Sequence, residues 1–376
     1  LACNGPADTT TATTTPGPDR AAAAADGTMR LTAAAIEPVT VFSYEDILWG
    51  FRFLPDGRIL ATDKSGKLLL SDRAGNGKTI TTGVPVVRDA NQGGLLDLLL
   101  DQDFANNRLV YLAYSEPDAA GDMANTAIGR GRLADDEASL EDFTVLYSAG
   151  PKTKVTRHYG SRMVWGPEDG HLYFTIGDRG DRDVNPQDST RDCGKVYRIA
   201  ADGSIPDDNP FVDYSGAKKA IWSYGHRNPQ SLTVHPETGA IWETEHGPRG
   251  GDEINLIEPG KNYGWPVISY GINYNGTQFT QKVSQKGMEQ PLHYWVPSIA
   301  PSGMAFVTGD RYPGWKGDLM VGSLKYMHLQ HVQLDGEKVL GEQKLINGLG
   351  RVRDVRMGPD DFLYASVEGE GIVRLE

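Results

Sequence analysis

The 376-residue sequence has little cysteine and no long apolar run. Its two cysteines, Cys3 and Cys193, match neither a zinc-site spacing nor a disulfide framework. No stretch approaches the roughly 18 apolar residues that a membrane-spanning helix needs, and no amphipathic helix stands out. The sequence also lacks a C-x-x-C-H haem-attachment motif and a G-x-G-x-x-G that follows a strand and opens a helix, which argues against covalent haem and NAD as cofactors.

Basic residues are outnumbered by acidic ones. The chain has 37 Lys and Arg against 50 Asp and Glu, a net charge of −13. This balance argues against nucleic acid as a partner, because phosphate binding needs a basic surface. It is compatible with bound divalent cations, although acidic surfaces usually serve solubility. The abundant residues are glycine (45) and tyrosine (16), with 7 tryptophans, and together they favour β-structure with tight turns.

Residues 1–38 are predicted to form a disordered tail, because runs of Thr, Ala and Pro cannot supply a core. The opening Leu1-Ala2-Cys3-Asn4 resembles the end of a lipoprotein signal, in which the cysteine is lipidated. On this interpretation the tail is a tether, Cys3 carries a lipid anchor, and the protein is exported to the periplasm or the cell surface. The alternative is a chance occurrence of Leu-Ala-Cys.

In residues 39–376 one pattern recurs, in which a turn rich in Pro, Asp, Glu and Gly joins two apolar strands. Six copies at an irregular spacing of about 45 to 75 residues predict an all-β, six-bladed β-propeller with four-stranded antiparallel blades. The last run, 371–376, is expected to close the ring in a blade that also uses N-terminal chain. A pair of β-sandwiches is the alternative fold. The copies lie at 51–62, 95–112, 163–176, 232–244, 304–321 and 355–365.

The third hairpin carries an ionisable residue on each side. His158 precedes its first strand, and Asp178 follows its second strand in a loop bracketed by glycines. Because antiparallel neighbours bring these two positions to the same end of a sheet, we expect an ionisable pair at a mouth of the propeller. Taken alone, a histidine before a strand is more often a surface or hydrogen-bonded residue.

Other candidates lie at strand ends, where propellers usually carry function. Arg227-Asn228 offers a fork of donors plus an amide, although a turn or salt bridge would also explain the pair. The carbonyls of the Gly247-Pro248 turn could point outward, as hard cations prefer. Glu253 could ligate a second ion. A simple turn and a solvated glutamate are the alternatives for these two motifs.

Two arginines, Arg351 and Arg353, are two residues apart and therefore share one face of a strand. Next to a channel they are unfavourable unless they meet anions. Neutralising the surplus of carboxylates is the alternative role. Gln92 lies in a polar, glycine-rich turn that leads into a buried strand.

These motifs together resemble the soluble aldose sugar dehydrogenases that depend on pyrroloquinoline quinone (PQQ), the soluble glucose dehydrogenase family. The resemblance runs from about Trp49 to the C-terminus. Each motif alone is weak, but their joint occurrence in this order is highly specific. They are QGGLL at 92–96, the stretch 158–180, YGHRNPQ at 224–230, EHGP at 245–248, DEIN at 252–255, NYGWP at 262–266, GSLK at 322–325 and RVRD at 351–354.

The resemblance implies oxidation of the anomeric hydroxyl of aldose sugars to lactones, with hydride transfer to PQQ. His158 matches the general base that takes the hydroxyl proton, a task that suits its near-neutral pKa. Asp178 matches the acid that orients this base or contacts substrate. Gln92 matches a polar residue at the sugar site and is counted with the cofactor-binding residues.

The resemblance also assigns residues to the cofactor. Lys325, Arg351 and Arg353 match positions that clamp its carboxylates. Arg227 and Asn228 match donors near the quinone oxygens, which places Arg227 among the catalytic residues as well.

A metal is implied too. The carbonyls of Gly247 and Pro248 match ligands of a Ca²⁺ that binds the cofactor and polarises it as a Lewis acid. Glu253 and Tyr263 match ligands of a second, structural Ca²⁺. His246 stands where some members carry glutamine, and it is assigned as a cofactor contact.

The implied partners are small aldose sugars and, without a haem motif, a separate electron acceptor; the protein is expected to be a monomer or homodimer. Two other classes remain open. A Ca²⁺-dependent propeller hydrolase of the lactonase type would give the basic cluster of Lys325, Arg351 and Arg353 no role. In a non-catalytic binding propeller of the same family, the base and the clamp would be expected to have eroded.

Overall fold

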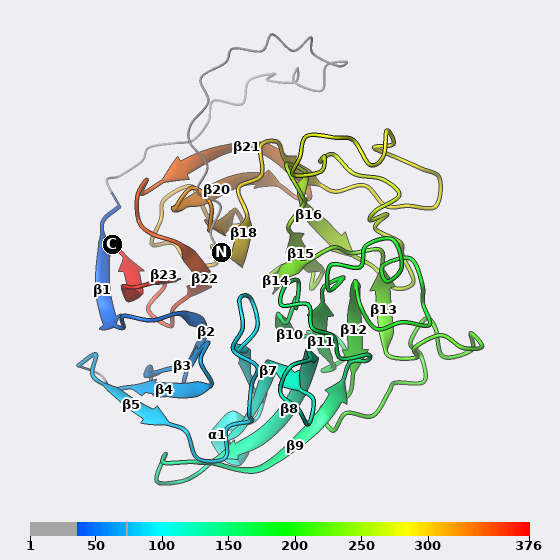
Figure 1. Ribbon diagram of the computed structural model, residues 1–376. Coiled ribbons are helices and arrows are strands. Elements are labelled where there is room, and N and C mark those ends of the chain that lie inside the picture. Colours follow the sequence, from blue (N-terminus) through cyan, green and yellow to red (C-terminus); the bar gives the residue numbers. More distant parts are fainter. Residues whose placement is uncertain (1–35, 73) are drawn as a thin grey trace.

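Six four-stranded sheets form a ring in the computed structural model, which describes residues 36–72 and 74–376 (Figure 1). Neighbouring strands within each sheet are antiparallel. The predicted six-bladed β-propeller is therefore confirmed, and each predicted hairpin forms the first two strands of one blade.

Five blades are simple meanders, β2–β5, β6–β9, β10–β13, β14–β17 and β18–β21, and the sixth has the order β1-β24-β23-β22. The elements are β1 (Pro38–Ser43), β2 (Leu48–Phe53), β3 (Ile59–Asp63), β4 (Lys67–Ser71), β5 (Gly77–Ile80), β6 (Leu95–Leu100), α1 (Phe104–Asn107), β7 (Leu109–Pro117), β8 (Ala124–Leu133), β9 (Leu140–Ser148), β10 (Met163–Trp165), β11 (Leu172–Ile176), β12 (Lys195–Ile199), β13 (Ile221–Tyr224), β14 (Pro229–Val234), β15 (Ile241–Glu245), β16 (Asp252–Ile257), β17 (His293–Trp295), β18 (Pro301–Phe306), β19 (Leu319–Ser323), β20 (His328–Asp335), β21 (Lys338–Leu345), β22 (Val352–Met357), β23 (Leu363–Val367) and β24 (Gly371–Leu375).

The hydrophobic core lies between neighbouring blades. Tyr111 and Ile128 of one blade, for example, pack in the same buried cluster as Phe174 and Tyr197 of the next. The rings of Phe174 and Tyr197 stack with their centroids 4.9 Å apart. Because both faces of a blade are covered in this way, middle strands such as β11 are buried at every position and appear in the sequence as continuous apolar runs.

The ring is closed as the sequence predicts, by the C-terminal strand β24 pairing with β1. Backbone hydrogen bonds of 2.9 Å in both directions between Glu37 and Glu376 extend this pairing by one residue. β1 itself begins at Pro38, the last residue of the predicted tail, and its pairing with the C-terminal chain reaches back to Glu37. The lipid-anchor prediction at Cys3 lies outside the described residues.

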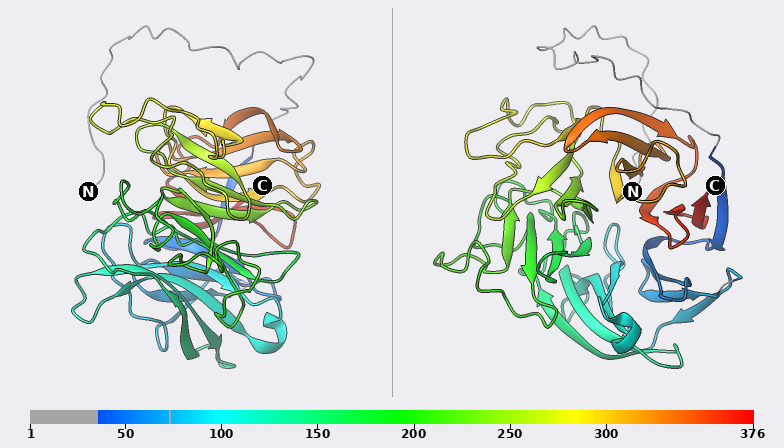
Figure 2. Two further views of the ribbon diagram at one scale, coloured as in Figure 1. Left: turned by 90° about the vertical axis from the view of Figure 1, so that its right-hand side faces the viewer. Right: turned by 180° about the vertical axis from the view of Figure 1, so that it is seen from behind.

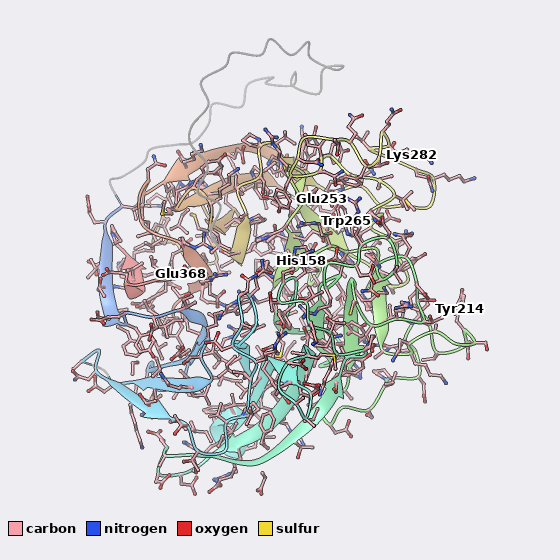
Figure 3. The ribbon with its side chains drawn as sticks, viewed as in Figure 1. His158, Tyr214, Glu253, Trp265, Lys282 and Glu368 are labelled. Atoms are coloured by element: carbon pink, nitrogen blue, oxygen red, sulfur yellow. The ribbon has the colours of Figure 1, made fainter. Side chains whose placement is uncertain are left out.

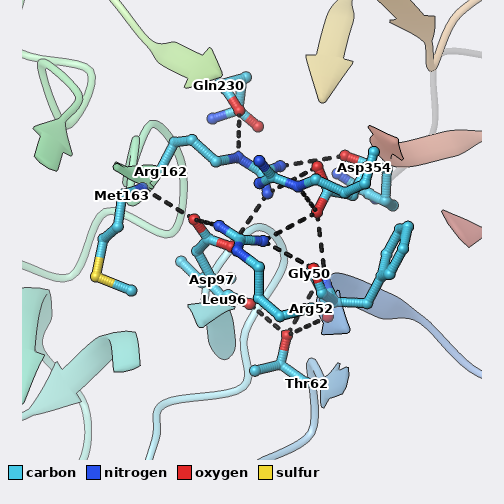
Figure 4. A network of polar contacts seen from close by, with 12 residues as sticks. Gly50, Arg52, Thr62, Leu96, Asp97, Arg162, Met163, Gln230 and Asp354 are labelled. Atoms are coloured by element: carbon cyan, nitrogen blue, oxygen red, sulfur yellow. Dashed lines mark hydrogen bonds and ion pairs between the residues drawn. The ribbon is translucent and has the colours of Figure 1, made fainter. Parts of the chain in front are cut away.

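Charged side chains fill the middle of the ring (Figure 4). The Arg162 guanidinium lies 3.2 Å from Asp97 and 3.1 Å from Asp354, and it also donates to the carbonyl of Gln230 at 3.0 Å. Arg52 reaches the same two carboxylates at 3.3 and 3.5 Å. These residues come from or adjoin the first strands of five blades, so the network holds the inner strands at fixed positions.

Long connections extend from the sheets, as the views from the side and from behind show (Figure 2). The connection between β16 and β17 spans residues 258–292 and carries Tyr263 and Trp265. In the part of the chain that the structure describes, no helix is long and apolar enough to cross a membrane. Cys193 is buried and forms no disulfide within the described residues.

Candidate active site

His158 and Asp178 form a buried dyad at one end of the β10–β11 hairpin. His158 lies in the connection before β10, and Asp178 lies two residues after β11. Their Nδ1 and Oδ1 atoms are 2.6 Å apart, and the two residues are 8% and 1% exposed. Figure 3 places His158 near the middle of the ring. The predicted proximity of the pair is confirmed.

Two further donors fix the Asp178 carboxylate. The backbone N–H of Gly180 donates to Oδ1 at 2.6 Å, and the indole N–H of Trp265 donates to Oδ2 at 2.9 Å. Trp265 belongs to the NYGWP motif, but no role was predicted for it. Its position follows from the long β16–β17 connection, which folds back over the Asp178 loop.

These bonds determine the state of the dyad. A carboxylate can only accept, so the proton on the His158 ring is on Nδ1 and the Nε2 lone pair is free to act as a base. Burial and the charge of Arg227 lower the pKa of His158, although Asp178 opposes this shift. Burial raises the pKa of Asp178, but His158, Arg227 and Gly180 outweigh it and the net shift is downward. The pair is therefore a neutral imidazole held by an ionised carboxylate.

The backbone around His158 is tightly constrained. His158 has a left-handed φ of 57°, and its N–H donates to the side-chain oxygen of Gln92 at 2.7 Å. Gln92 therefore lies beside the dyad. Gly177 passes so close that a Cβ there would lie 2.4 Å from the His158 carbonyl oxygen. A side chain at 177 would push the base out of place.

Arg227 and Asn228 lie in the turn between β13 and β14, and Glu245 holds that turn. Both backbone N–H groups donate to Glu245 Oε2, at 2.5 and 3.2 Å. The Arg227 guanidinium donates to the carbonyls of His246 and Gly247 at 2.9 and 2.8 Å, and lies over the Trp265 ring at 5.3 Å. Arg227 thus contacts two of the motifs found in the sequence, NYGWP through Trp265 and EHGP through the carbonyls of His246 and Gly247.

His246 is partly buried and lines the same pocket as Arg227. Its Nε2–H donates to the carbonyl of Pro301 at 2.6 Å, which leaves the Nδ1 lone pair unprotonated. Burial lowers the pKa of His246 to about 3, and the charges of Arg227, His158 and Arg353 add to this effect while the Pro301 bond opposes it. His246 is therefore neutral at physiological pH.

Three of the four predicted metal ligands line one small pocket. Gly247, Glu253 and Tyr263 surround it together with Glu245, whereas Pro248 does not line it. The Tyr263 hydroxyl donates to the Leu256 carbonyl and accepts from the Glu258 N–H at 3.0 Å, so this hydroxyl is not a free ligand. The Gly247 carbonyl accepts from Arg227 and keeps its second lone pair.

The basic cluster lies on other blades. Arg351 and Arg353 both bond the carboxylate of Glu368, Arg351 at 2.9 Å. Arg351 also donates to the carbonyl of Leu324 at 3.0 Å, which brings it beside the exposed Lys325. The anion that the paired arginines require is thus supplied in part by Glu368, which sequence reasoning missed. Figure 3 shows Glu368 across the centre of the ring from Glu253 and Trp265.

This arrangement defines a class of protein: a propeller with a base held by a carboxylate, an acidic pocket beside it and a basic cluster across the ring. Residues 45–374 match the family described as Glucose / Sorbosone dehydrogenase, and the chain belongs to that family. The predicted family and the prediction that the chain is a dehydrogenase are both confirmed.

Three relatives illustrate the match. Aldose sugar dehydrogenase YliI of Escherichia coli (strain K12) is 42% identical over 320 residues, 84% of this chain and 85% of the relative. A crystal structure of a glucose dehydrogenase superimposes with a TM-score of 0.86 at 41% identity, covering 90% of this chain and 99% of that one. The PQQ-bound aldose sugar dehydrogenase of Streptomyces coelicolor gives a TM-score of 0.74 at 26% identity, covering 91% and 98%.

Proposed function

We propose that the protein oxidises the anomeric hydroxyl of aldose sugars to lactones, with PQQ as cofactor and His158 as general base. The observation that carries this proposal is the buried His158–Asp178 dyad, whose free Nε2 lone pair can accept a hydroxyl proton. The names of the relatives, aldose sugar dehydrogenase and glucose dehydrogenase, supply the substrate class.

The side chains present fit a cofactor that carries several carboxylates. Lys325, Arg351 and Arg353 bring three positive charges against the single negative charge of Glu368, so the cluster keeps a net charge of +2. A guanidinium pairs with a carboxylate through two parallel hydrogen bonds. A lactonase-type hydrolase would leave this surplus of positive charge without a role.

Ca²⁺ fits the acidic side of the site. The Gly247 carbonyl and the carboxylates of Glu245 and Glu253 line the pocket, and hard cations prefer such oxygen ligands. The Pro248 carbonyl completes the proposed set at the cofactor, and the backbone carbonyl of Tyr263 with Glu253 would hold the second, structural Ca²⁺.

In this mechanism His158 takes the proton of the anomeric hydroxyl on Nε2, and Asp178 stabilises the imidazolium that forms. When bound, PQQ supplies an ortho-quinone that accepts the hydride from the sugar carbon. The guanidinium of Arg227, fixed by the carbonyls of His246 and Gly247, and the amide of Asn228 provide hydrogen-bond donors at the proposed quinone position. Gln92 positions the backbone of His158 beside the sugar site.

Reconstitution tests the proposal. The purified chain is loaded with PQQ and Ca²⁺, and dye reduction is followed with a panel of aldoses. Turnover should require both additions, and His158→Ala should lose turnover while it keeps cofactor binding. His171→Ala is the matched control, since His171 lies in the β10–β11 turn at the other end of the same hairpin. A wild-type protein that neither binds PQQ nor turns over would refute the assignment.

A second variant tests the clamp. Arg353→Ala should weaken PQQ binding by about ten- to a hundredfold, the range for one lost charge-assisted hydrogen bond. Arg132→Ala, which removes a partly exposed arginine from β8 of another blade, should leave the affinity unchanged. Equal affinity in Arg353→Ala and the wild type would remove the basic cluster from the cofactor site. Export as a lipoprotein through Cys3 and transfer of electrons to a separate acceptor remain part of the proposal.

A further inference from the structure

The blade formed by β14–β17 carries an acidic cluster on one buried face. Glu243 and Glu245 alternate along β15, so both side chains point to the same face of the sheet. On the neighbouring strand β16, Asn255 lies opposite Glu243 and Glu253 lies opposite Glu245. Carboxylates directly opposite each other repel, and Glu243 is fully buried. Within residues 36–72 and 74–376, neither Glu243 nor Glu253 forms an ion pair with an arginine or lysine.

A histidine faces this cluster from the turn before β14. His226 is also fully buried, and its ring stacks on Tyr263 with centroids 4.6 Å apart. One atom each of His226, Glu243 and Glu245 can be chosen so that all three lie within 4.8 Å of one another. His226 Nδ1 and Glu245 Oε1 are 3.5 Å apart.

Each of the three side chains has one polar atom fixed by the protein. Ser223 Oγ is 2.9 Å from His226 Nε2, and Asn255 donates to Glu243 Oε2 at 3.0 Å. Glu245 Oε2 accepts the two backbone N–H groups described above. Such outer partners orient metal ligands in known sites.

In the His226 and Glu243 side chains, the second polar atom has no hydrogen bond. His226 Nδ1 and Glu243 Oε1 are both buried and have no hydrogen-bond partner. A buried polar atom without a partner is costly, so native proteins seldom leave two of them together. Two free lone pairs and a third carboxylate oxygen that meet at one point are the donor set of a cation.

We propose that His226 Nδ1, Glu243 Oε1 and Glu245 Oε1 bind one divalent transition-metal ion, of the Zn²⁺ or Mn²⁺ type. An imidazole with two carboxylates is a donor set that these ions accept, whereas Ca²⁺ takes six to eight oxygens. In a tetrahedral zinc site neighbouring ligand atoms are about 3.3 Å apart, by the metal–ligand distances of such sites, and the 3.5 Å between His226 and Glu245 is close to this. The site shares Glu245 with the lining of the pocket proposed for Ca²⁺, but it includes none of the predicted Ca²⁺ ligands Gly247, Pro248, Glu253 and Tyr263.

The ion would stabilise the turn that carries Arg227 and Asn228 in the dehydrogenase site. Glu245 holds the Arg227-Asn228 turn through one carboxylate oxygen and the ion through the other. The metal would therefore link β15 to that turn and stabilise the folded chain, because it binds the native state alone. This inference does not depend on the substrate or on PQQ.

The test uses the full chain without a histidine tag, stripped with a chelator and then kept in excess Ca²⁺ to fill oxygen-only sites. Titration with Zn²⁺ should show one tight equivalent per chain and a raised thermal midpoint. Glu243→Gln should weaken this binding at least about a hundredfold, because it removes a charged ligand and loss of an outer partner alone costs about ten- to a hundredfold. Glu258→Gln, which removes a carboxylate from the rim of the same blade, is the matched control and should bind as the wild type does.

A measurement on the wild type covers the case in which Glu243→Gln does not fold. Mn²⁺ in the stripped protein should show electron–nuclear coupling to a ¹⁴N nucleus, the signature of the His226 imidazole. Absence of a tight Zn²⁺ equivalent in the wild type, equal affinity in Glu243→Gln, or bound Mn²⁺ without nitrogen coupling would each overturn the proposal. If the wild type binds no tight Zn²⁺ equivalent, a shared proton holds the carboxylates of Glu243 and Glu245 together instead.

Discussion

Replacing Asp178 by asparagine tests the dyad with the smallest change of shape. The carboxylate accepts from His158 Nδ1–H at 2.6 Å, Gly180 N–H at 2.6 Å and the Trp265 indole N–H at 2.9 Å. An asparagine has one acceptor oxygen and one NH₂ group. Whichever way the amide lies, its NH₂ group faces one of the fixed donors, so one buried N–H loses its acceptor.

The two orientations differ in their effect on the base. With the amide oxygen toward His158 and Gly180, Trp265 loses its partner and the histidine keeps its proton on Nδ1. With the oxygen toward Trp265, Gly180 loses its partner and the histidine proton moves to Nε2, where the lone pair is needed. An unpaired buried donor costs about 1–3 kcal/mol, and the free energy of unfolding should fall by that amount. Because the charge that stabilises the imidazolium is also lost, kcat should fall by about 10²- to 10⁴-fold.

Trp265→Phe in the Asp178→Asn background separates stability from catalysis. This change removes the indole N–H, so in the first orientation the amide NH₂ group no longer faces a second donor. The double variant should regain part of the lost stability in urea unfolding, while its kcat in dye reduction stays low. An Asp178→Asn protein that turns over as fast as the wild type would refute the assigned role of the carboxylate.

Three further predictions concern the ring centre, the packing at the dyad and the pH profile. Arg162→Met should lower the free energy of unfolding by about 3 kcal/mol, because it leaves buried carboxylates short of a cation. In urea titration Arg132→Met, at a partly exposed surface ion pair, should change it by less than about 1 kcal/mol. Gly177→Ala should lower kcat because its Cβ would lie 2.4 Å from the His158 carbonyl oxygen, whereas Gly121→Ala, where a Cβ meets open space, should leave kcat unchanged. Since the pKa of His158 is lowered below 6.5 by burial and by a nearby arginine, kcat/KM should rise with pH to a plateau with a midpoint below pH 6.5, and a midpoint above 6.5 would contradict the assignment. The same shift means that the unfolded chain takes up a proton at a higher pH than the folded one, so stability should fall as the pH drops below about 6.5.

The parts of the fold that the sequence predicted are those encoded locally. Each blade begins with a hairpin whose turn and two apolar strands are adjacent in the chain, as in 51–62, so the number and position of the blades could be inferred. The dyad was predictable for the same reason, because the β10–β11 hairpin alone brings His158 and Asp178 together. The motifs assigned both Arg227 and His246 to the cofactor, and in the structure both follow strand ends at one side of the ring.

The residues that were missed depend on contacts between distant segments. Trp265 reaches Asp178 from 87 positions away, through a long connection whose course no local pattern specifies. Glu368 meets the two arginines only because β22 and β23 are paired in one register. A signal for the acidic cluster was present, since the alternation of Glu243 and Glu245 in a strand puts both on one face. That the face is buried, and that Glu253 lies opposite, required the structure.

The site as a whole is divided by charge, and this division supports a metal–carboxylate complex as its ligand. On one side Glu245 and Glu253 line a pocket together with the carbonyl of Gly247. On the other side Arg351 and Arg353 share only one carboxylate. The carboxylates of Glu245 and Glu253 favour a bound cation, and the guanidinium groups of Arg351 and Arg353 favour a bound anion. A neutral ligand would compensate neither charge. Under the proposed function, Ca²⁺ bound to a polycarboxylate would satisfy both, and the neutral His158 would then need only a hydroxyl group to deprotonate.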